Sequence, residues 1–116
     1  MSDQNNLIPF AINEEIIKEI ELLDLPVFKK HHLRLLMHCL KVFKDLLSDS
    51  KNNFLSEDIL LNWCSSQAKD FDDPKFTDLL FVQMNKVLIL LRNHSLKVGK
   101  KIADLEMRDL LDLINN

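Results

Sequence analysis

Apolar residues recur three and four positions apart along most of the chain, the spacing that places side chains on one face of an α-helix. This pattern predicts five helices, over about residues 14–24, 26–47, 56–69, 74–96 and 105–114. The two longest, 26–47 and 74–96, are expected to form the antiparallel spine of a compact all-α bundle. Residues 1–8 are polar and are expected to form a flexible N-terminus, which leaves 9–116 as a single helical domain.

Residues with special backbone preferences stand at the expected helix ends. Pro26 and Pro74 suit the first turn of a helix, where a missing N–H costs little. Gly99, the only glycine, suits the left-handed backbone position that ends a helix. Side-chain oxygens that cap the first turn are expected from Asn13, Ser56, Asp73 and Asp104.

The composition also favours helices. Leucine occurs 23 times, whereas the chain has one glycine and no tyrosine. Leucine loses little rotamer freedom in a helix, and sheets are enriched in β-branched and aromatic residues. Apolar residues make up 47% of the 116 residues, which suffices for one core and one domain.

The cysteines and the N-terminal sequence indicate the cellular compartment in which the protein is expected. Cys39 and Cys64 fall at apolar helical positions and are too few for a disulfide framework, so we expect buried, reduced thiols. The first ten residues lack the basic and apolar regions of a signal peptide. The longest apolar stretch, Leu79–Leu91, is shorter than the roughly 20 residues that span a membrane. These features predict a cytoplasmic protein that does not cross a membrane.

Helix 26–47 has a basic polar face in a chain that is acidic overall. This segment carries a charge of +4, which leaves −7 for the rest of a chain of net charge −3. Such a face is typical of a surface that docks an acidic protein partner, although acidic neighbours within the chain are the alternative explanation. Nucleic acid is the weaker alternative as a partner, because a pI of 5.7 lacks the expected basic footprint. The hypothesised contacts are Lys30, Arg34, His38 and Lys41, and a second basic stretch extends them with Arg92, Lys97, Lys100 and Lys101.

The run His38-x-Leu40-Lys41 resembles the motif of histidine-containing phosphotransfer domains, which are helical bundles of about this length. The resemblance covers about four residues. It implies that His38 is exposed in the middle of a helix and accepts a phosphoryl group, with Lys41 beside it. The family pattern continues with a glycine and small residues, whereas bulky residues follow Lys41 here. Phosphotransfer through His38 is therefore an alternative function.

Other chemistry has little support in the residue pattern. His32 is expected to face the apolar side near Cys39, either as a core histidine with a backbone partner or as part of a ligand pair or pH-sensitive element. Neither His-x-x-x-His nor Cys-x-x-Cys occurs, so we expect no metal or other cofactor. Gly-rich phosphate loops and a Gly-x-Ser-x-Gly sequence are also missing. We therefore predict a small non-enzymatic interaction or regulatory protein.

Helix 74–96 has two apolar residues on its otherwise polar side. Val82 and Ile89 lie seven residues apart, beside Asp78, Asn85 and Arg92. A helix in a small single-core protein is expected to have one wet face. Either this helix is central and surrounded, which we expect, or Val82 and Ile89 form the contact of a homodimer.

Overall fold

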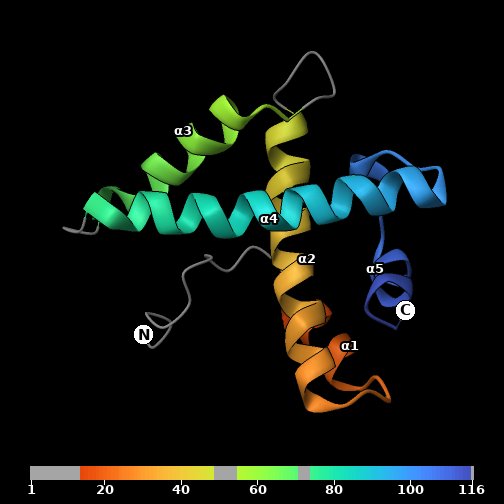
Figure 1. Cartoon of the computed structure of the whole chain (residues 1–116). Helices are drawn as coiled ribbons and strands as arrows, with labels where there is room; N and C mark the ends of the chain where they lie inside the picture. Colours follow the sequence, from red (N-terminus) through yellow and green to blue (C-terminus); the bar gives the residue numbers. More distant parts are fainter. Residues whose placement is uncertain (1–13, 49–54, 71–73, 116) are drawn as a thin grey trace.

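The computed structural model describes residues 14–48, 55–70 and 74–115, most of which lie in helices (Figure 1). Those ranges contain no strand, so the predicted all-α fold class is confirmed. None of the helices within them is both long and apolar enough to cross a membrane. The α-helices are α1 (Glu14–Glu21), α2 (Val27–Ser48), α3 (Glu57–Gln67), α4 (Pro74–Val98) and α5 (Met107–Asn115), and the 3-10 turns are η2 (Ala68–Asp70) and η3 (Ile102–Asp104).

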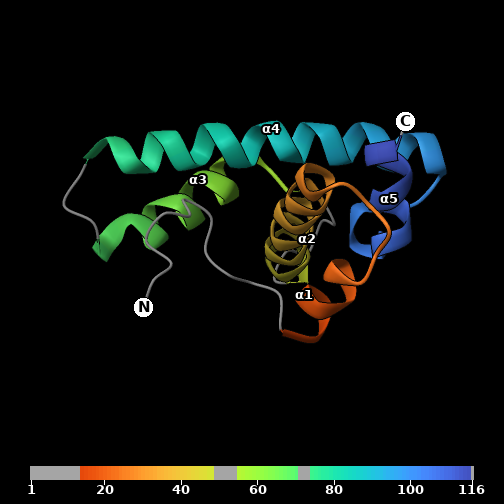
Figure 2. The same ribbon diagram turned by 90° about the horizontal axis from the view of Figure 1, so that it is seen from below.

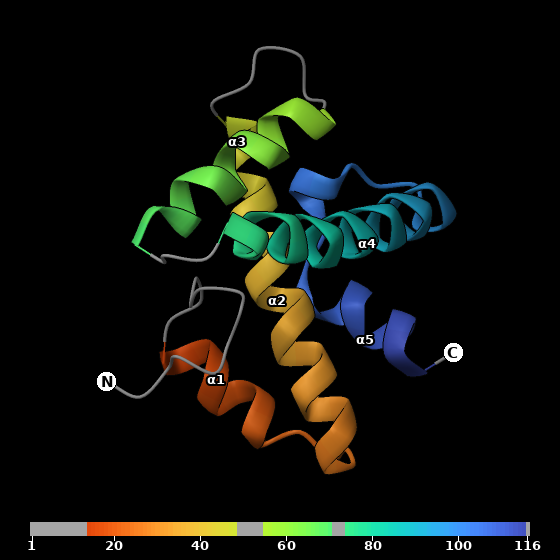
Figure 3. The ribbon, with the colours of Figure 1, turned by 60° about the vertical axis from the view of Figure 1, so that its left-hand side comes forward.

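Helix α2 lies at the centre of the arrangement and is covered from several directions. α4 crosses one side of α2, and α1 packs on the side away from α4 (Figure 2). α3 runs along the first half of α4, whereas η3 and α5 pack against α2 beneath the second half of α4. Figure 3 shows α1 and α5 on two different sides of α2. The outer face of α4 is left without a neighbouring helix among the described elements (Figure 2).

Helices α2 and α4 pack together, but they cross instead of lying side by side as an antiparallel spine (Figures 1 and 2). The reason is the width of the apolar arc on α2. One antiparallel neighbour covers only a narrow stripe of a helix, whereas this arc is shared among α1, α4, α5 and η3. The antiparallel neighbour of α4 is instead α3.

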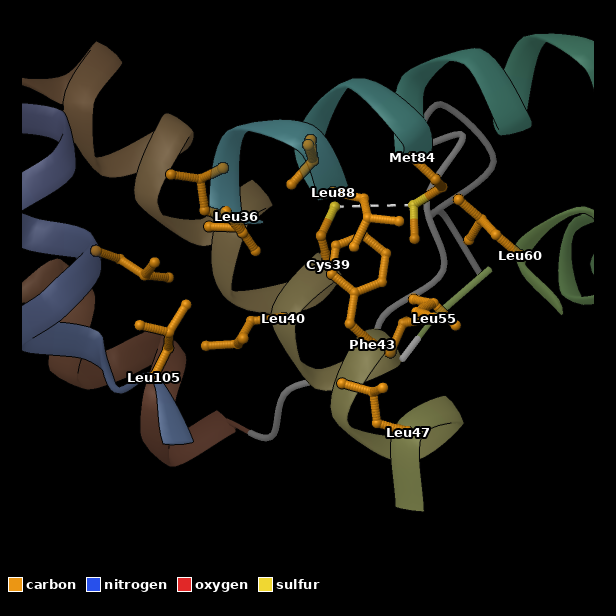
Figure 4. Close-up of a cluster of buried hydrophobic side chains, with 14 of the residues drawn as sticks. Leu36, Cys39, Leu40, Phe43, Leu47, Leu55, Leu60, Met84, Leu88 and Leu105 are labelled. Carbon is orange, nitrogen blue, oxygen red and sulfur yellow. Dashed lines mark hydrogen bonds between the residues drawn. The ribbon is translucent and has the colours of Figure 1, made fainter. Parts of the chain in front are cut away.

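The crossing of α2 and α4 forms the centre of the hydrophobic core (Figure 4). Sγ of Cys39 lies 3.8 Å from Sδ of Met84 across this crossing. Cys39 and Cys64 are both free and buried, as the sequence predicts. Burial raises the pKa of the Cys39 thiol to about 12, so this thiol stays protonated and packs as a small apolar group. The buried side chains at the crossing include Leu36, Cys39, Leu40, Phe43, Leu60, Met84 and Leu88.

Two predicted helix ends are confirmed. Ser56 caps α3, because its Oγ accepts a hydrogen bond from the Ile59 amide at 3.2 Å. Gly99 ends α4 in the left-handed region, at φ 74°. The Lys100 amide then donates to the Ser95 carbonyl at 3.0 Å, which is the pattern of a Schellman turn. This turn sends the chain from the end of α4 toward η3.

The start of the last helix differs from the prediction. Asp104 belongs to η3 and does not cap α5, which begins at Met107. The Asp109 carboxylate takes that role, because its Oδ2 accepts a hydrogen bond from the Glu106 amide at 2.8 Å. The 3-10 turn η3 has three residues, which are too few to show a helical period. The spacing of apolar residues therefore does not predict it. The predictions that lie outside the described residues are those for 1–8, Asn13 and Asp73.

Candidate partner-binding surface

The basic side chains of α2 are used in part within the chain. Nζ of Lys30 donates to the Glu21 carbonyl at 2.7 Å, so Lys30 ties the end of α1 to the start of α2. Nζ of Lys41 lies 2.9 Å from Oδ1 of Asp45, one turn further along α2. Both members of this pair are exposed, so it contributes little to stability and leaves Lys41 accessible. Fewer basic side chains of α2 are therefore available to a partner than the sequence predicts.

His38 lies inside the fold and not on the exposed polar face, which corrects the prediction. The residue is only 6% exposed. Burial, and then the positive charge of Arg34, lower the pKa of the imidazole. The neighbours of α2 cover more of its surface than its polar pattern indicates, and Val42, one turn beyond His38, is buried as well. His38 therefore offers neither the exposed nucleophile that phosphotransfer requires nor an accessible partner contact.

Arg34 occupies an intermediate position on the same face. It is half-buried, and its Nη2 lies 3.4 Å from Nδ1 of His31. The guanidinium thus lies beside one histidine and lowers the pKa of another, His38. Arg34 therefore lies at the edge of the core, close to two histidines of the same helix.

His32 is exposed and does not face the core beside Cys39, which corrects the second histidine prediction. The neighbours of α2 do not reach the edge of its apolar arc. Phe28, His32 and Leu35 follow one another at helical spacing along that edge, and all three are exposed. The core contact of Cys39 is Met84.

A groove lies where the end of α2, the last turns of α4 and η3 meet. Its volume is about 490 Å³. Apolar side chains and three cationic side chains line it, and none of the lining residues that the structure describes is acidic. It therefore joins an apolar surface to positive charge at one place. The lining residues are Leu47, Leu55, Arg92, Ser95, Leu96, Gly99, Lys100, Lys101, Ile102 and Ala103.

Two of the cations in the groove are held in place by hydrogen bonds. Nη2 of Arg92 donates to the Leu55 carbonyl at 2.7 Å, which links α4 to the residue before the α3 cap. Nζ of Lys100 lies 3.0 Å from Oδ2 of Asp109. Lys101 is exposed and forms no ion pair within the described ranges. Of the three cations, Lys101 is the best placed to meet a ligand carboxylate.

Asp109 joins the basic stretch to α5, and the sequence pattern does not reveal it. The residue is 6% exposed, and its Oδ2 accepts hydrogen bonds from the Glu106 amide and from Lys100. Nε2 of the buried His94 lies 2.7 Å from the Asp109 carbonyl, to which an Nε2–H donates. Burial alone raises the pKa of the carboxyl group, but the two hydrogen bonds and the charges of Lys100 and Arg108 outweigh it, so the pKa is lowered.

Val82 and Ile89 point away from the core. They are 50% and 48% exposed, on the face of α4 that no described helix covers (Figure 2). Helix α4 is therefore not surrounded within the described part of the fold, which overturns the first of the two alternatives predicted for these residues. The second alternative, contact with another chain, stays a prediction.

The described fold is a small all-α arrangement with two exposed surfaces, the groove and the outer face of α4. The residues described here include no group of three or more His, Cys, Asp or Glu side chains that could hold a metal ion. A family model described as NDH complex assembly factor CRR9 matches residues 12–116, and the chain belongs to this family. An assembly-factor family is not a catalytic family, which agrees with the prediction of a small non-enzymatic interaction protein. No curated protein and no solved structure matches the chain.

Proposed function

We propose that this protein acts in the assembly of an NDH complex, by holding an acidic segment of a protein partner in the groove between α2, α4 and η3. The assembly role follows the description of its family. The docking site rests on one observation, the combination of an apolar lining with Arg92, Lys100 and Lys101 and with no acidic side chain among the described lining residues.

This combination suits a segment that carries both apolar and acidic side chains. Leu96 is 79% exposed and Ile102 is half-buried, so these two residues supply apolar surface that such a segment covers. Burial of apolar surface is the main source of binding free energy. Lys101 supplies charge at the rim. Because the whole chain has a net charge of −3, a local cationic site selects and orients acidic segments instead of attracting every polyanion.

The second basic stretch carries this proposal better than the basic face of α2 does. Lys97 and Lys101 are exposed and form no ion pair within the described residues. On α2, Lys30 is bonded to the Glu21 carbonyl and Lys41 is paired with Asp45. We therefore place the acidic partner at the end of α4 and not on the basic face of α2.

Two new carboxylates in the groove test the proposal. The change Lys101→Glu with Ala103→Glu alters two exposed lining residues, so the fold is expected to persist. In cells that make an NDH complex, the tagged wild-type protein should co-isolate subunits of that complex. The variant should recover them about tenfold less well, because like charges then face each other at the site.

A control with the same change of charge elsewhere is Lys41→Glu with Ser65→Glu, at exposed positions on α2 and α3. It should recover the same subunits as the wild type. Loss in the control but not in the groove variant would move the docking site to the basic face of α2. Recovery of no NDH subunit by the wild-type protein would contradict the assembly role.

A further inference from the structure

The outer face of α4 carries a row of exposed apolar side chains. No described helix covers this face (Figure 2). Leu79 is 55% exposed, Val82 50%, Ile89 48% and Leu96 79%. The opposite face of the same helix is buried, with Leu80, Met84, Leu88 and Leu91 in the core. Helix α4 is thus apolar on two sides, and the described part of the fold buries only one of them.

The spacing of the stripe is that of a helix–helix seam. Val82, Ile89 and Leu96 lie seven residues apart, and Leu79, Lys86 and Asn93 alternate with them at intervals of three and four. These are the two core positions of a heptad repeat. From Leu79 to Leu96 the seam is about 26 Å long at a rise of ~1.5 Å per residue, enough for about five turns of a partner helix.

The charges along this face are mostly positive. Lys86 occupies a core position at the middle of the seam, and Lys97 lies toward its C-terminal end. Both lysines are exposed, and Asp78, near the start of the seam, is the only acidic residue within α4 itself. A partner therefore meets apolar surface together with ammonium groups.

The lysine at the middle of the seam disfavours a second copy as the partner. Two copies that pair along the stripe, parallel or antiparallel, bring their two Lys86 side chains to within about one turn of each other. Covering like charges in this way is costly, because each charge loses water without gaining an opposite charge. A carboxylate opposite Lys86 removes that cost.

We infer that the outer face of α4 binds an acidic amphipathic helix of another protein, whose apolar stripe covers Val82 and Ile89 and whose carboxylates meet Lys86 and Lys97. The surface adjoins the groove at Leu96 but extends beyond it along α4, and the inference does not depend on the assembly role. It replaces the homodimer predicted for Val82 and Ile89 with a heterologous contact.

A pair of designed peptides tests the inference on the full-length protein. Both have about 21 residues and the same leucine heptads; one carries glutamate and the other lysine at all flanking positions. Fluorescence anisotropy should show that the acidic peptide binds at least about tenfold more tightly than the basic peptide. The single change Lys86→Glu should weaken binding of the acidic peptide about fivefold, at the upper end of what an exposed charge contributes.

The double change Val82→Asp with Ile89→Asp should abolish binding of the acidic peptide. Its control is Leu22→Asp with Leu61→Asp, at apolar positions of α1–α2 and α3 that are 86% and 40% exposed. The control should bind like the wild type. If the double variant loses its helical circular dichroism, its loss of binding reflects unfolding, and the Lys86→Glu variant then tests the inference. Lys86 is exposed and outside the core, so this change is expected to leave the fold intact.

Sedimentation velocity separates the second copy from the foreign helix. The wild-type protein should be a monomer that forms a one-to-one complex with the acidic peptide. A wild-type dimer that Val82→Asp dissociates would overturn the inference, as would equal affinity for the two peptides. Lys101→Glu with Ala103→Glu leaves Val82 and Ile89 unchanged, so a failure here is distinct from a failure of the groove.

Discussion

Replacing Phe43 with alanine is expected to lower the free energy of unfolding by about 3–5 kcal/mol. The Phe43 side chain is fully buried where α2 crosses α4, next to Cys39, Leu47 and Leu55 (Figure 4). Its removal leaves a cavity at the crossing of α2 and α4, and the surrounding side chains close such a cavity only in part. Small domains have a free energy of unfolding of about 5–15 kcal/mol, so this single change removes a large part of the stability of the protein.

Urea denaturation followed by circular dichroism measures this loss. The matched control is Phe28→Ala on the same helix, because Phe28 is 69% exposed and its removal leaves no cavity. The control should change the free energy of unfolding by less than about 0.5 kcal/mol. Equal losses for the two variants would contradict the helix packing described for α2.

Replacing Asp109 with alanine is expected to lower the free energy of unfolding by about 2–3 kcal/mol at neutral pH. The change removes the acceptor of two hydrogen bonds, one from the Glu106 amide that starts α5 and one from the Lys100 ammonium group. It also leaves Lys100 without its carboxylate at the rim of the groove. The exposed Asp112 on the same helix supplies the control, Asp112→Ala, which should have little effect.

The contribution of Asp109 should depend on pH with a defined sign. Folding lowers the pKa of this carboxyl group from its ordinary value of 3.8, so the folded state favours the ionised form. The contribution is therefore complete above about pH 4–5 and is lost as the pH falls below 3.8 through the lowered pKa. The difference in stability between wild type and Asp109→Ala should narrow on acidification over that range. A difference that widens there would show that the carboxylate is not the stabilising form.

The sequence predicts the helices well because each one carries its own apolar period and its own end signals. Ser56 and Gly99 show this, since both act within one turn of the chain and do what their residue types predict. The arrangement of the helices is less predictable. Whether α2 and α4 cross or run side by side depends on how several neighbours share one apolar arc, which no single helix encodes.

The surfaces were predictable only where one helix determines them. The exposed pair Val82 and Ile89 stands out on a helical wheel of α4. His38 looks polar on the wheel of α2, but its burial comes from neighbours elsewhere in the sequence. The groove has the same origin, because Leu47 and Ile102 are brought together by the fold, and only the basic residues of its rim are visible in the sequence. Asp109 likewise gains its role from the cap of α5 and from contact with His94.

The amount of assembled NDH complex in cells that lack this protein, measured on a native gel, tests the central claim most directly. Complementation with the wild-type chain or with Lys41→Glu, Ser65→Glu should restore the complex. The groove variant Lys101→Glu, Ala103→Glu should fail to restore it, although it accumulates to the same level as the wild-type protein. Full restoration by the groove variant would contradict the docking site, and a normal amount of complex without the protein would contradict the assembly role.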